Sequence, residues 1–327
     1  MSIPFSRRTA WDREETPYAA AVREARSAAG PLFDLTVSNP TQCSFRYAPE
    51  LLAALVDPRA LVYTAEPHGL ASARQAIAEY YAAHGASVEP DALVLTTSTS
   101  ESYSFLFRLL CDPGDEVLIA QPSYPLFDFL ADLDDVRLRS YPLFFDHGWW
   151  IDFAELERRL SDRTRAIVVV HPNNPTGHWT STAERIRLER ICASRGLALI
   201  VDEVFLDYGL ASGPAAESFA AAPSPALTFC LSGISKIVAL PQMKAAWIAA
   251  CGPEALRVEA LARLEIIADT FLSMNTPVQL ALPFWLAGRA SIQGQILERV
   301  RGNLRYLQAA ALGHPDRLRV LPPEAGW

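Results

Sequence analysis

The sequence predicts an α/β protein with a central sheet that is mixed and mostly parallel, plus a second, smaller domain. Three observations carry this prediction. From about Leu93 onward, short apolar runs alternate with amphipathic stretches, as strands and helices do in α/β folds. Several of the runs are continuously apolar, which is typical of strands buried on both faces of a parallel sheet. The 327 residues are enough for about two domains.

The predicted elements follow this alternation. We expect strands at Leu93–Thr97, Glu116–Ala120, Ala166–His171, Leu197–Val201, Leu227–Leu231 and Ala246–Cys251. We expect helices at Glu101–Leu110, Phe153–Leu160, Thr182–Ser194, Glu254–Ala268, Pro277–Ala287 and Ser291–Leu312. The segment Asp112–Asp115 has the Pro-Gly composition of a turn between a helix and the next strand.

The order of these elements suggests how the domains are divided. Residues 1–45 are expected to form an N-terminal arm and part of the small domain. Residues 46–270 are expected to form the large domain. Residues 271–327, where the pattern is helical, are expected to complete as much of the small domain as this chain contains.

Composition excludes several classes of function. The net charge is −8, so the chain lacks the global basic surface that nucleic-acid binding requires. Ser218–Ser235 is a long charge-free stretch, but it contains two prolines and reads as a loop and a buried strand, not as a membrane span. The N-terminus has no apolar segment of the signal-peptide type.

The spacing of cysteines, histidines and glycines argues against further kinds of site. The five cysteines lie far apart without a CxxC pair, which favours free thiols in a reducing cytoplasm. The six histidines show no metal-ligand spacing, so no catalytic metal is expected. No GxGxxG follows a strand, which argues against a dinucleotide site.

Polar segments follow five of the predicted strands. They are Thr97–Ser100, Gln121–Tyr124, His171–Gly177, Asp202–Glu203 and Ser232–Lys236. Ligands of open α/β sheets bind outside the carboxyl ends of the strands. We therefore expect these segments to surround one site.

Lysine is the rarest cation in this chain. Of the 29 lysines and arginines, 27 are arginine, and only Lys236 and Lys244 remain. Codon bias explains the scarcity, and a lone lysine is most often a surface residue. Lys236, however, follows an apolar strand in a small-residue turn, where desolvation would lower its pKa and free its amine to form a Schiff base. Asp202 is equally well explained as a capping group or as the partner of a buried cation.

Together these motifs resemble the class I/II aminotransferases among the fold-type I pyridoxal-phosphate (PLP) enzymes. The matching segments are Asn174–Gly177, Asp202–Val204, Ser235–Lys236 with Leu240, Pro241 and Lys244, Tyr63 with Gly69 and Arg74, and Pro122–Pro125. The stretch Gly69–Tyr81 looks like that family's first conserved helix. The resemblance runs in the family's order from about Tyr63 to Trp247.

The resemblance implies a PLP-binding large domain and a role for each matching residue. Lys236 would hold the cofactor as an internal aldimine and then move protons during a ping-pong transfer of an amino group from an L-amino acid to a 2-oxo acid. Asp202 would pair with the pyridine nitrogen, Asn174 with the phenolic oxygen, and Tyr124 would stack on the ring. The remaining implied cofactor contacts, which seat the phosphate, are Ser98, Thr99, Ser100, Ser235, Lys244 and, from the neighbouring subunit of a homodimer, Tyr63.

The sequence departs from the family pattern at four positions. Ser98 stands where the family often has glycine, and Gly233 stands where a serine is common. Phe205 replaces a tyrosine that would bind the phenolic oxygen, and Lys244 replaces an arginine. Ser232 or Ser235 could compensate for the hydroxyl that Gly233 lacks. None of these changes removes Lys236, Asp202 or Asn174.

The last residues, Pro322–Trp327, read like the start of a strand and not like a natural terminus. Family members continue and supply an arginine that binds the substrate α-carboxylate. Either the chain is a fragment or the carboxylate is bound otherwise. Arg46 is a possible substitute, although a solvated surface arginine is the more usual role.

Three functions therefore remain open from the sequence. The first is an aminotransferase, and the second is a PLP-dependent lyase or decarboxylase on the same fold, because substrate contacts decide which bond is broken. The third is a catalytically incomplete member of the family. Adjacent Trp149 and Trp150 could line an aromatic pocket, but packing in the core or at a sheet edge is the better interpretation.

Overall fold

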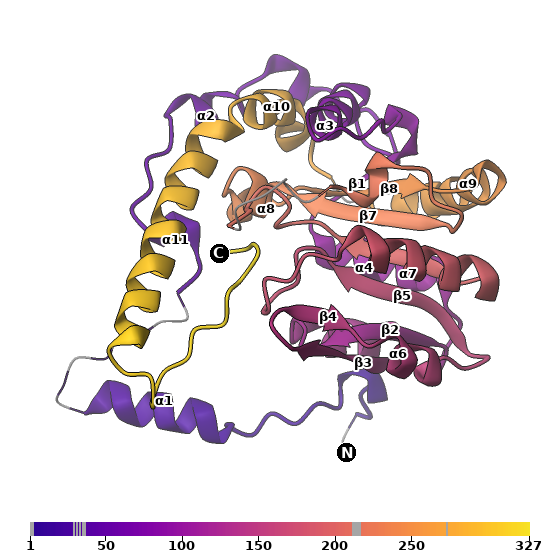
Figure 1. Ribbon diagram of the computed structural model, residues 1–327. Coiled ribbons are helices and arrows are strands. Elements are labelled where there is room, and N and C mark those ends of the chain that lie inside the picture. The colour runs from indigo at the N-terminus through magenta and orange to yellow at the C-terminus, as the bar shows by residue number, and fades with distance from the viewer. Residues whose placement is uncertain are drawn as a thin grey trace.

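An eight-stranded sheet forms the centre of the computed structural model (Figure 1), which describes residues 3–28, 30, 32, 34, 37–210, 217–272 and 274–327. The strands are β1 (Leu93–Thr96), β2 (Glu116–Gln121), β3 (Arg137–Phe145), β4 (Trp149–Ile151), β5 (Thr164–Val170), β6 (Ala198–Asp202), β7 (Thr228–Gly233) and β8 (Ala246–Cys251). Their order across the sheet is β1-β8-β7-β6-β5-β2-β3-β4.

The directions of the strands confirm the predicted sheet. β7, β6, β5, β2 and β3 run parallel in the centre. β8 lies antiparallel between β1 and β7, and β4 returns antiparallel to β3 at the opposite edge. The central strands β5 and β6 are almost wholly buried, which explains why their sequences are apolar without alternation.

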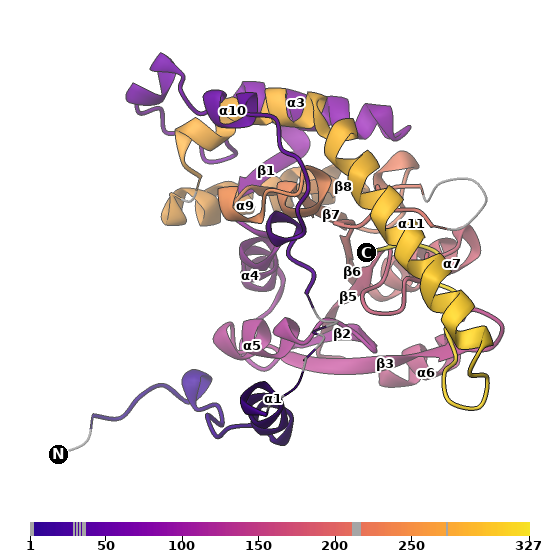
Figure 2. The same ribbon diagram turned by 90° about the vertical axis from the view of Figure 1, so that its left-hand side faces the viewer.

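Helices cover both faces of the sheet, as the two views together show (Figures 1 and 2). The helices are α1 (Pro17–Ser27), α2 (Glu50–Ala53), α3 (Ala71–Ala83), α4 (Thr99–Leu110), α5 (Leu126–Leu133), α6 (Phe153–Arg159), α7 (Thr182–Arg195), α8 (Ile234–Ile237), α9 (Glu254–Phe271), α10 (Thr276–Ala287) and α11 (Arg289–Leu312). One hydrophobic core joins α4, α5 and α9 to the sheet. A second joins α3, α6, α7 and α10 to the opposite face, and a smaller third cluster packs Phe205 and Tyr208 against α11.

All six predicted strands and all six predicted helices are present, with ends that differ by at most three residues. β3, β4, α1, α5 and the short helices α2 and α8 were not predicted from the sequence. β3 begins with alternating exposed and half-buried residues and carries Arg137, Arg139 and Pro142, so it lacks the continuous apolar run by which the buried strands were recognised. Trp150 is exposed on edge strand β4, while Trp149 packs against the core, as the edge-packing interpretation expected. Both tryptophans also line an open surface cavity of about 550 Å³, so the pocket alternative has support as well.

Two later elements approach the carboxyl ends of the strands. α11 runs alongside the sheet, and the segment 322–327 returns between α11 and the sheet (Figure 1). The backbone N–H groups of Glu324 and Ala325 both donate to Gly177 O, and Gly326 N–H donates to Tyr208 O. The domain boundaries proposed at residues 45/46 and 270/271 remain a proposal. No helix in the described part of the chain has the length and apolar character to cross a membrane.

Candidate active site

A cavity of about 420 Å³ opens where β6 and β7 end, beside the N-terminus of α4. It brings together nine of the ten residues that the sequence analysis named as a site. These are Ser98, Thr99, Ser100, Tyr124, Asn174, Asp202, Ser235, Lys236 and Lys244. The strand-end rule therefore located a real pocket.

Lys236 lies on the short helix α8, directly after β7. A four-residue helix leaves its last carbonyls without intrahelical partners, and side chains from elsewhere satisfy them here. Tyr208 Oη–H donates to Lys236 O over 2.6 Å, and Gln293 of α11 donates to Ile237 O over 2.9 Å. These bonds hold in place the turn that carries the lysine.

The Lys236 amine lies in an aromatic and mostly dehydrated environment. Its Nζ is 4.7 Å from the Trp327 ring centroid and 5.1 Å from that of Phe205. Burial lowers the pKa of Lys236, and the negative charge of Asp202 opposes this only in part. The amine therefore loses its proton more readily than a surface lysine would, as a nucleophilic lysine requires.

Asp202 is the last residue of β6 and is buried. Val204 N–H donates to its Oδ1 over 3.2 Å, and Tyr103 Oη–H donates to its Oδ2 over 3.1 Å. Burial raises the pKa of Asp202 to about 6, although these two hydrogen bonds and Lys236 pull it down. At neutral pH the carboxylate is therefore mostly ionised and could pair with a cationic nitrogen.

The N-terminus of α4 supplies the anion-binding end of the pocket. Ser98 is the N-cap, and its Oγ accepts from Glu101 N–H over 3.1 Å. The N–H groups of the first helical turn have no intrahelical acceptors, so those of Thr99 and Ser100 are available to an anion. Lys244, at positive φ and exposed, adds a cation on the same pocket.

Asn174 is held by a turn that its neighbour builds. Asn173 Oδ1 accepts from Thr176 Oγ1–H over 2.8 Å, and Asn173 O accepts from Gly177 N–H over 2.8 Å. Gly177 has φ of 71°, and a Cβ there would lie 2.7 Å from Ala325 O. The glycine of this motif is thus required both by its backbone conformation and by the close approach of the segment 322–327.

Two residues do not reach the pocket within this chain. Tyr63 is 76% exposed and lies beside a different cavity, together with Gln279. Arg46 is an exposed residue whose backbone is bonded on both sides by Gln295 of α11, and it does not line the site. Arg46 is therefore the solvated surface arginine that the sequence favoured, and the structure gives no support to the alternative that it replaces the carboxylate-binding arginine. No arginine lines this cavity in the part of the chain that the structure describes.

The departures from the family pattern have partial structural explanations. A Cβ at Gly233 would lie 2.9 Å from Ala245 O and 3.0 Å from Ala246 Cβ, because β8 packs closely there. A serine does not fit at this position without movement of β8. Ser235 lines the pocket, whereas Ser232 Oγ is buried and has no hydrogen-bond partner. Of the two candidates for compensation, Ser235 is the one in place.

Sequence reasoning did not name Tyr103 or Trp327 as site residues, although both line the pocket. Tyr103 lies on the buried face of α4, and its contact with Asp202 spans 99 positions. Trp327 contacts Tyr208 edge-on, with ring centroids 4.6 Å apart. No local motif marks either residue. Helical spacing places Tyr103 among the apolar core positions of α4, and the sequence gives no reason to separate it from them.

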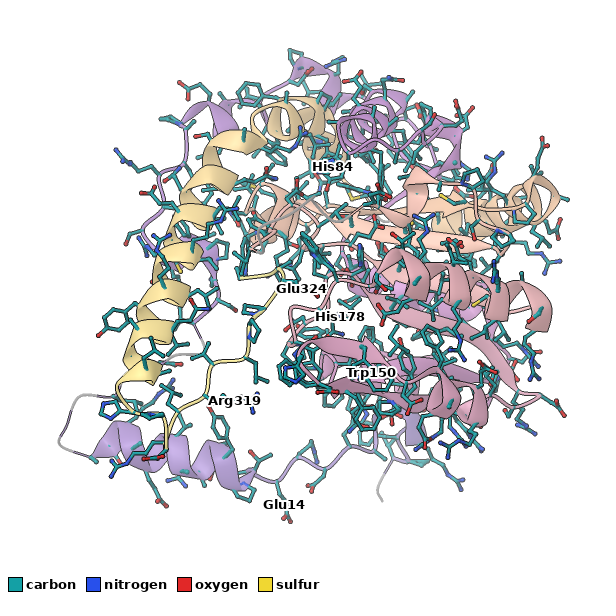
Figure 3. All side chains as sticks on the ribbon, viewed as in Figure 1. Glu14, His84, Trp150, His178, Arg319 and Glu324 are labelled. Atoms are coloured by element: carbon teal, nitrogen blue, oxygen red, sulfur yellow. The ribbon has the colours of Figure 1, made fainter. Side chains whose placement is uncertain are left out.

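An ion cluster around the buried His178 fastens the segment 322–327, and Figure 3 labels His178 and Glu324 of this cluster. His178 Nδ1 lies 3.2 Å from Glu324 Oε2, and its Nε2 lies 3.3 Å from Glu184 Oε2. Burial disfavours the imidazolium, but the two carboxylates outweigh it and raise the pKa of His178 to about 9. The pKa of Glu184 falls to about 2, because His178 and backbone donors outweigh its own burial.

Fold and site together define a class of protein. The model of the family "Aminotransferase class I and II" matches residues 33–326, and the chain belongs to this family. Members of the family use PLP, and the donor set of the pocket fits that cofactor. It combines a desolvated lysine, an ionisable buried carboxylate, an amide and an anion-binding helix end.

Similar proteins narrow the comparison further. The chain is 29% identical over 269 residues to the glutamate-pyruvate aminotransferase AlaA of Haemophilus influenzae, a match that covers 81% of this chain and 66% of that protein. It is 28% identical over 270 residues to an alanine aminotransferase of Mycobacterium tuberculosis, over 81% and 62% of the two chains. The match thus spans about two thirds of the length of these relatives or slightly less.

Solved structures share the fold. The alanine aminotransferase of Pyrococcus furiosus superposes with a TM-score of 0.86 at 23% identity, over 98% of this chain and 82% of that one. The aspartate aminotransferase of Thermotoga maritima gives a TM-score of 0.83 at 19% identity, over 99% and 84%. These likenesses confirm the fold-type I architecture that the sequence predicted.

Proposed function

We propose that the protein is a PLP-dependent aminotransferase that moves an amino group from an L-amino acid to a 2-oxo acid by a ping-pong mechanism. One observation carries the proposal. A single cavity holds Lys236, Asp202 and Asn174 together with the N-terminus of α4. PLP supplies the electron sink that stabilises a carbanion at the substrate α-carbon.

Lys236 is proposed to form the covalent imine link to the cofactor aldehyde and, once released, to act as the proton carrier. Its lowered pKa supports both roles, because the neutral amine is the nucleophile and also the base. Tyr208 and Gln293 bind the carbonyls of its turn. They support the role by restricting the positions from which the amine can reach the substrate.

The other proposed contacts hold the cofactor. Asp202 would accept a hydrogen bond from the protonated ring nitrogen, and Asn174 would donate to the phenolic oxygen. Tyr124, which is 49% exposed at the pocket, would stack on the ring. The phosphate would be bound by Ser98, Thr99, Ser100, Ser235 and Lys244.

The substrate class comes from the relatives. Those named above are alanine and glutamate-pyruvate aminotransferases, and we infer that small α-amino acids of this kind and their 2-oxo acids are the substrates here. Phe205 and Trp327 beside the Lys236 amine support this inference, because bulky aromatic walls next to the reacting amine leave room for a small side chain.

A homodimer is proposed from an exposed apolar surface. Leu61, Val62 and Tyr63 are 91%, 63% and 76% exposed on one segment, and burial of such side chains in an interface would be favourable. In such a dimer Tyr63 would reach the phosphate of the other subunit. Sedimentation that gives a monomer at micromolar concentration would refute the dimer. The five free cysteines support the cytoplasm as the compartment.

The scarcity of lysine makes the cofactor experiment unusually direct. Protein incubated with PLP, reduced with borohydride and digested should carry the label on Lys236 and not on Lys244, the only other lysine. Lys236→Arg is the matched control, since it keeps the charge but forms no imine. Label on Lys244 alone, or an unchanged visible band in the Lys236→Arg variant, would refute the assignment.

The reaction class has a separate test. Holoenzyme mixed singly with alanine, glutamate and other amino acids should convert to the pyridoxamine form, and pyruvate should reverse the change. Decarboxylated or eliminated product without this conversion would favour the lyase. A labelled cofactor that no amino acid changes would favour a catalytically incomplete member.

A further inference from the structure

The hydroxyl of Tyr103 has one described partner, the carboxylate of Asp202. Tyr103 is 3% exposed, and its ring packs edge-on against Phe127 with centroids 4.9 Å apart and tilted against Phe107 at 6.1 Å. Both neighbours are buried in the core. The ring is therefore fixed, and its hydroxyl reaches Asp202 from a rigid helix.

The described donors to the Asp202 carboxylate are one backbone N–H and the Tyr103 hydroxyl. Val204 N–H occupies Oδ1, and Tyr103 occupies Oδ2. The register partners of Asp202 on β5 and β7 are Val170 and Leu231, which carry no titratable group. Lys236 faces the carboxylate from α8. The neighbouring Glu203 is bound by Ser218 and Phe219 instead.

A buried carboxyl with so few donors would otherwise be protonated more easily. A phenol that donates to the ionised carboxylate favours that form, because the protonated form accepts the bond less strongly. The bond also fixes the side-chain rotamer, and each carboxylate oxygen retains a free acceptor site for a ring N–H. The same contact therefore controls both the charge and the direction of Asp202.

We propose that Tyr103 is a positioning residue for the cofactor, whose hydroxyl fixes the Asp202 carboxylate as an oriented anion opposite the ring nitrogen. The proposal rests on the proposed function insofar as it concerns the cofactor. Its first part, the coupling of Tyr103 to the charge of Asp202, is independent of any ligand. Tyr103→Phe tests it, because this change removes only the hydroxyl.

The first experiment uses the protein without cofactor. The unfolding free energy is measured by urea titration between pH 4 and 8 for the wild type, Tyr103→Phe, Asp202→Asn and the double variant. Asp202 has a folded pKa of about 6, above its ordinary value of 3.8, so its contribution falls as pH rises between these values and is constant above them. Tyr103→Phe removes one charge-assisted hydrogen bond to Asp202. We therefore expect the fall in unfolding free energy to continue to a pH about one unit higher than in the wild type. The extension should be absent in the Asp202→Asn background.

The second experiment measures the PLP dissociation constant against pH for the same four proteins. Tyr103→Phe should weaken binding roughly fivefold near pH 6 and less at pH 8, with almost no further effect in the Asp202→Asn background. Tyr141→Phe is the matched control. This tyrosine is equally buried, but its hydroxyl donates to Val168 O on β5, so its loss should not move either pH profile.

The outcomes separate the inference from the proposed function. An unmoved stability profile in Tyr103→Phe, or effects that add in the double variant, would overturn the inference even if PLP binds normally. If Tyr103→Phe shifts the stability profile but the wild type binds no PLP, the proposed function and the cofactor part of the inference are refuted. Only the coupling of Tyr103 to Asp202 then stands.

Discussion

Replacement of His178 by glutamine should remove a pH-dependent part of the stability of the fold. The imidazolium lies between Glu184 and Glu324, and its pKa is raised from 6.5 to about 9. A raised histidine pKa contributes stability that is fully present below 6.5, declines as pH rises and is gone above about 9. Each pKa step is worth about 1.4 kcal/mol, so the contribution is about 3 kcal/mol. The lowered pKa of Glu184 reports the same ion pair and is not added.

The assay is urea unfolding at intervals between pH 6 and 10 for the wild type and His178→Gln. Other groups titrate in this window, so the informative quantity is the difference between the two proteins. That difference should shrink by about 3 kcal/mol from pH 6.5 to 9. His147→Gln is the control, because this side chain is 99% exposed at the surface. Parallel curves for wild type and His178→Gln across this range would refute the reasoning.

Three further changes test other parts of the structure. Gly233→Ser should destabilise the protein by roughly 1–3 kcal/mol in urea unfolding, because its Cβ meets the backbone of β8; an unchanged midpoint would show that β8 yields freely. Arg185→Leu should cost roughly 3–5 kcal/mol in the same assay, since the buried Glu189 loses its partner and the carbonyls of Ser218 and Phe219 lose a donor; the double change with Glu189→Leu should recover part of the loss, and no recovery would contradict this account. Asn173→Ala should weaken PLP binding several-fold in an equilibrium titration by freeing the turn that holds Asn174, and an unaltered affinity would show that the turn holds without it.

The sequence was sufficient for the parts of the fold that rest on local pattern. Buried parallel strands are continuously apolar, and each polar segment after such a strand reached the same pocket. β3 escaped prediction because it lies next to an edge and shows water-facing residues such as Arg137 and Arg139. α1 has no buried residue, so it lacks the apolar stripe by which a helix is recognised.

The site was predictable only where a residue lies in the motif it serves. Asp202 ends a strand, and Asn174 and Lys236 each follow one, so strand-end reasoning found them. Tyr63 resembles a family tyrosine, but its proposed place is in another subunit, and a single chain leaves it exposed. Trp327 lies beside Lys236 although the sequence between the two residues includes all of α11. No local spacing encodes such a contact.

The two lysines show how far the amino-acid composition predicts the reactive residue. An arginine at position 236 would stay protonated between Phe205 and Trp327, whereas burial lowers the pKa of a lysine there. Lys244 lies exposed on the same pocket, and nothing in the structure explains lysine rather than arginine at that position. The reactivity of Lys236 therefore follows from its surroundings and not from its rarity.

The surroundings of Lys236 must satisfy two opposite demands, since Asp202 has to remain an anion while the nearby amine gives up its proton. Val204 N–H and the Tyr103 hydroxyl meet the first demand by donating to Asp202, and the burial of Lys236 meets the second.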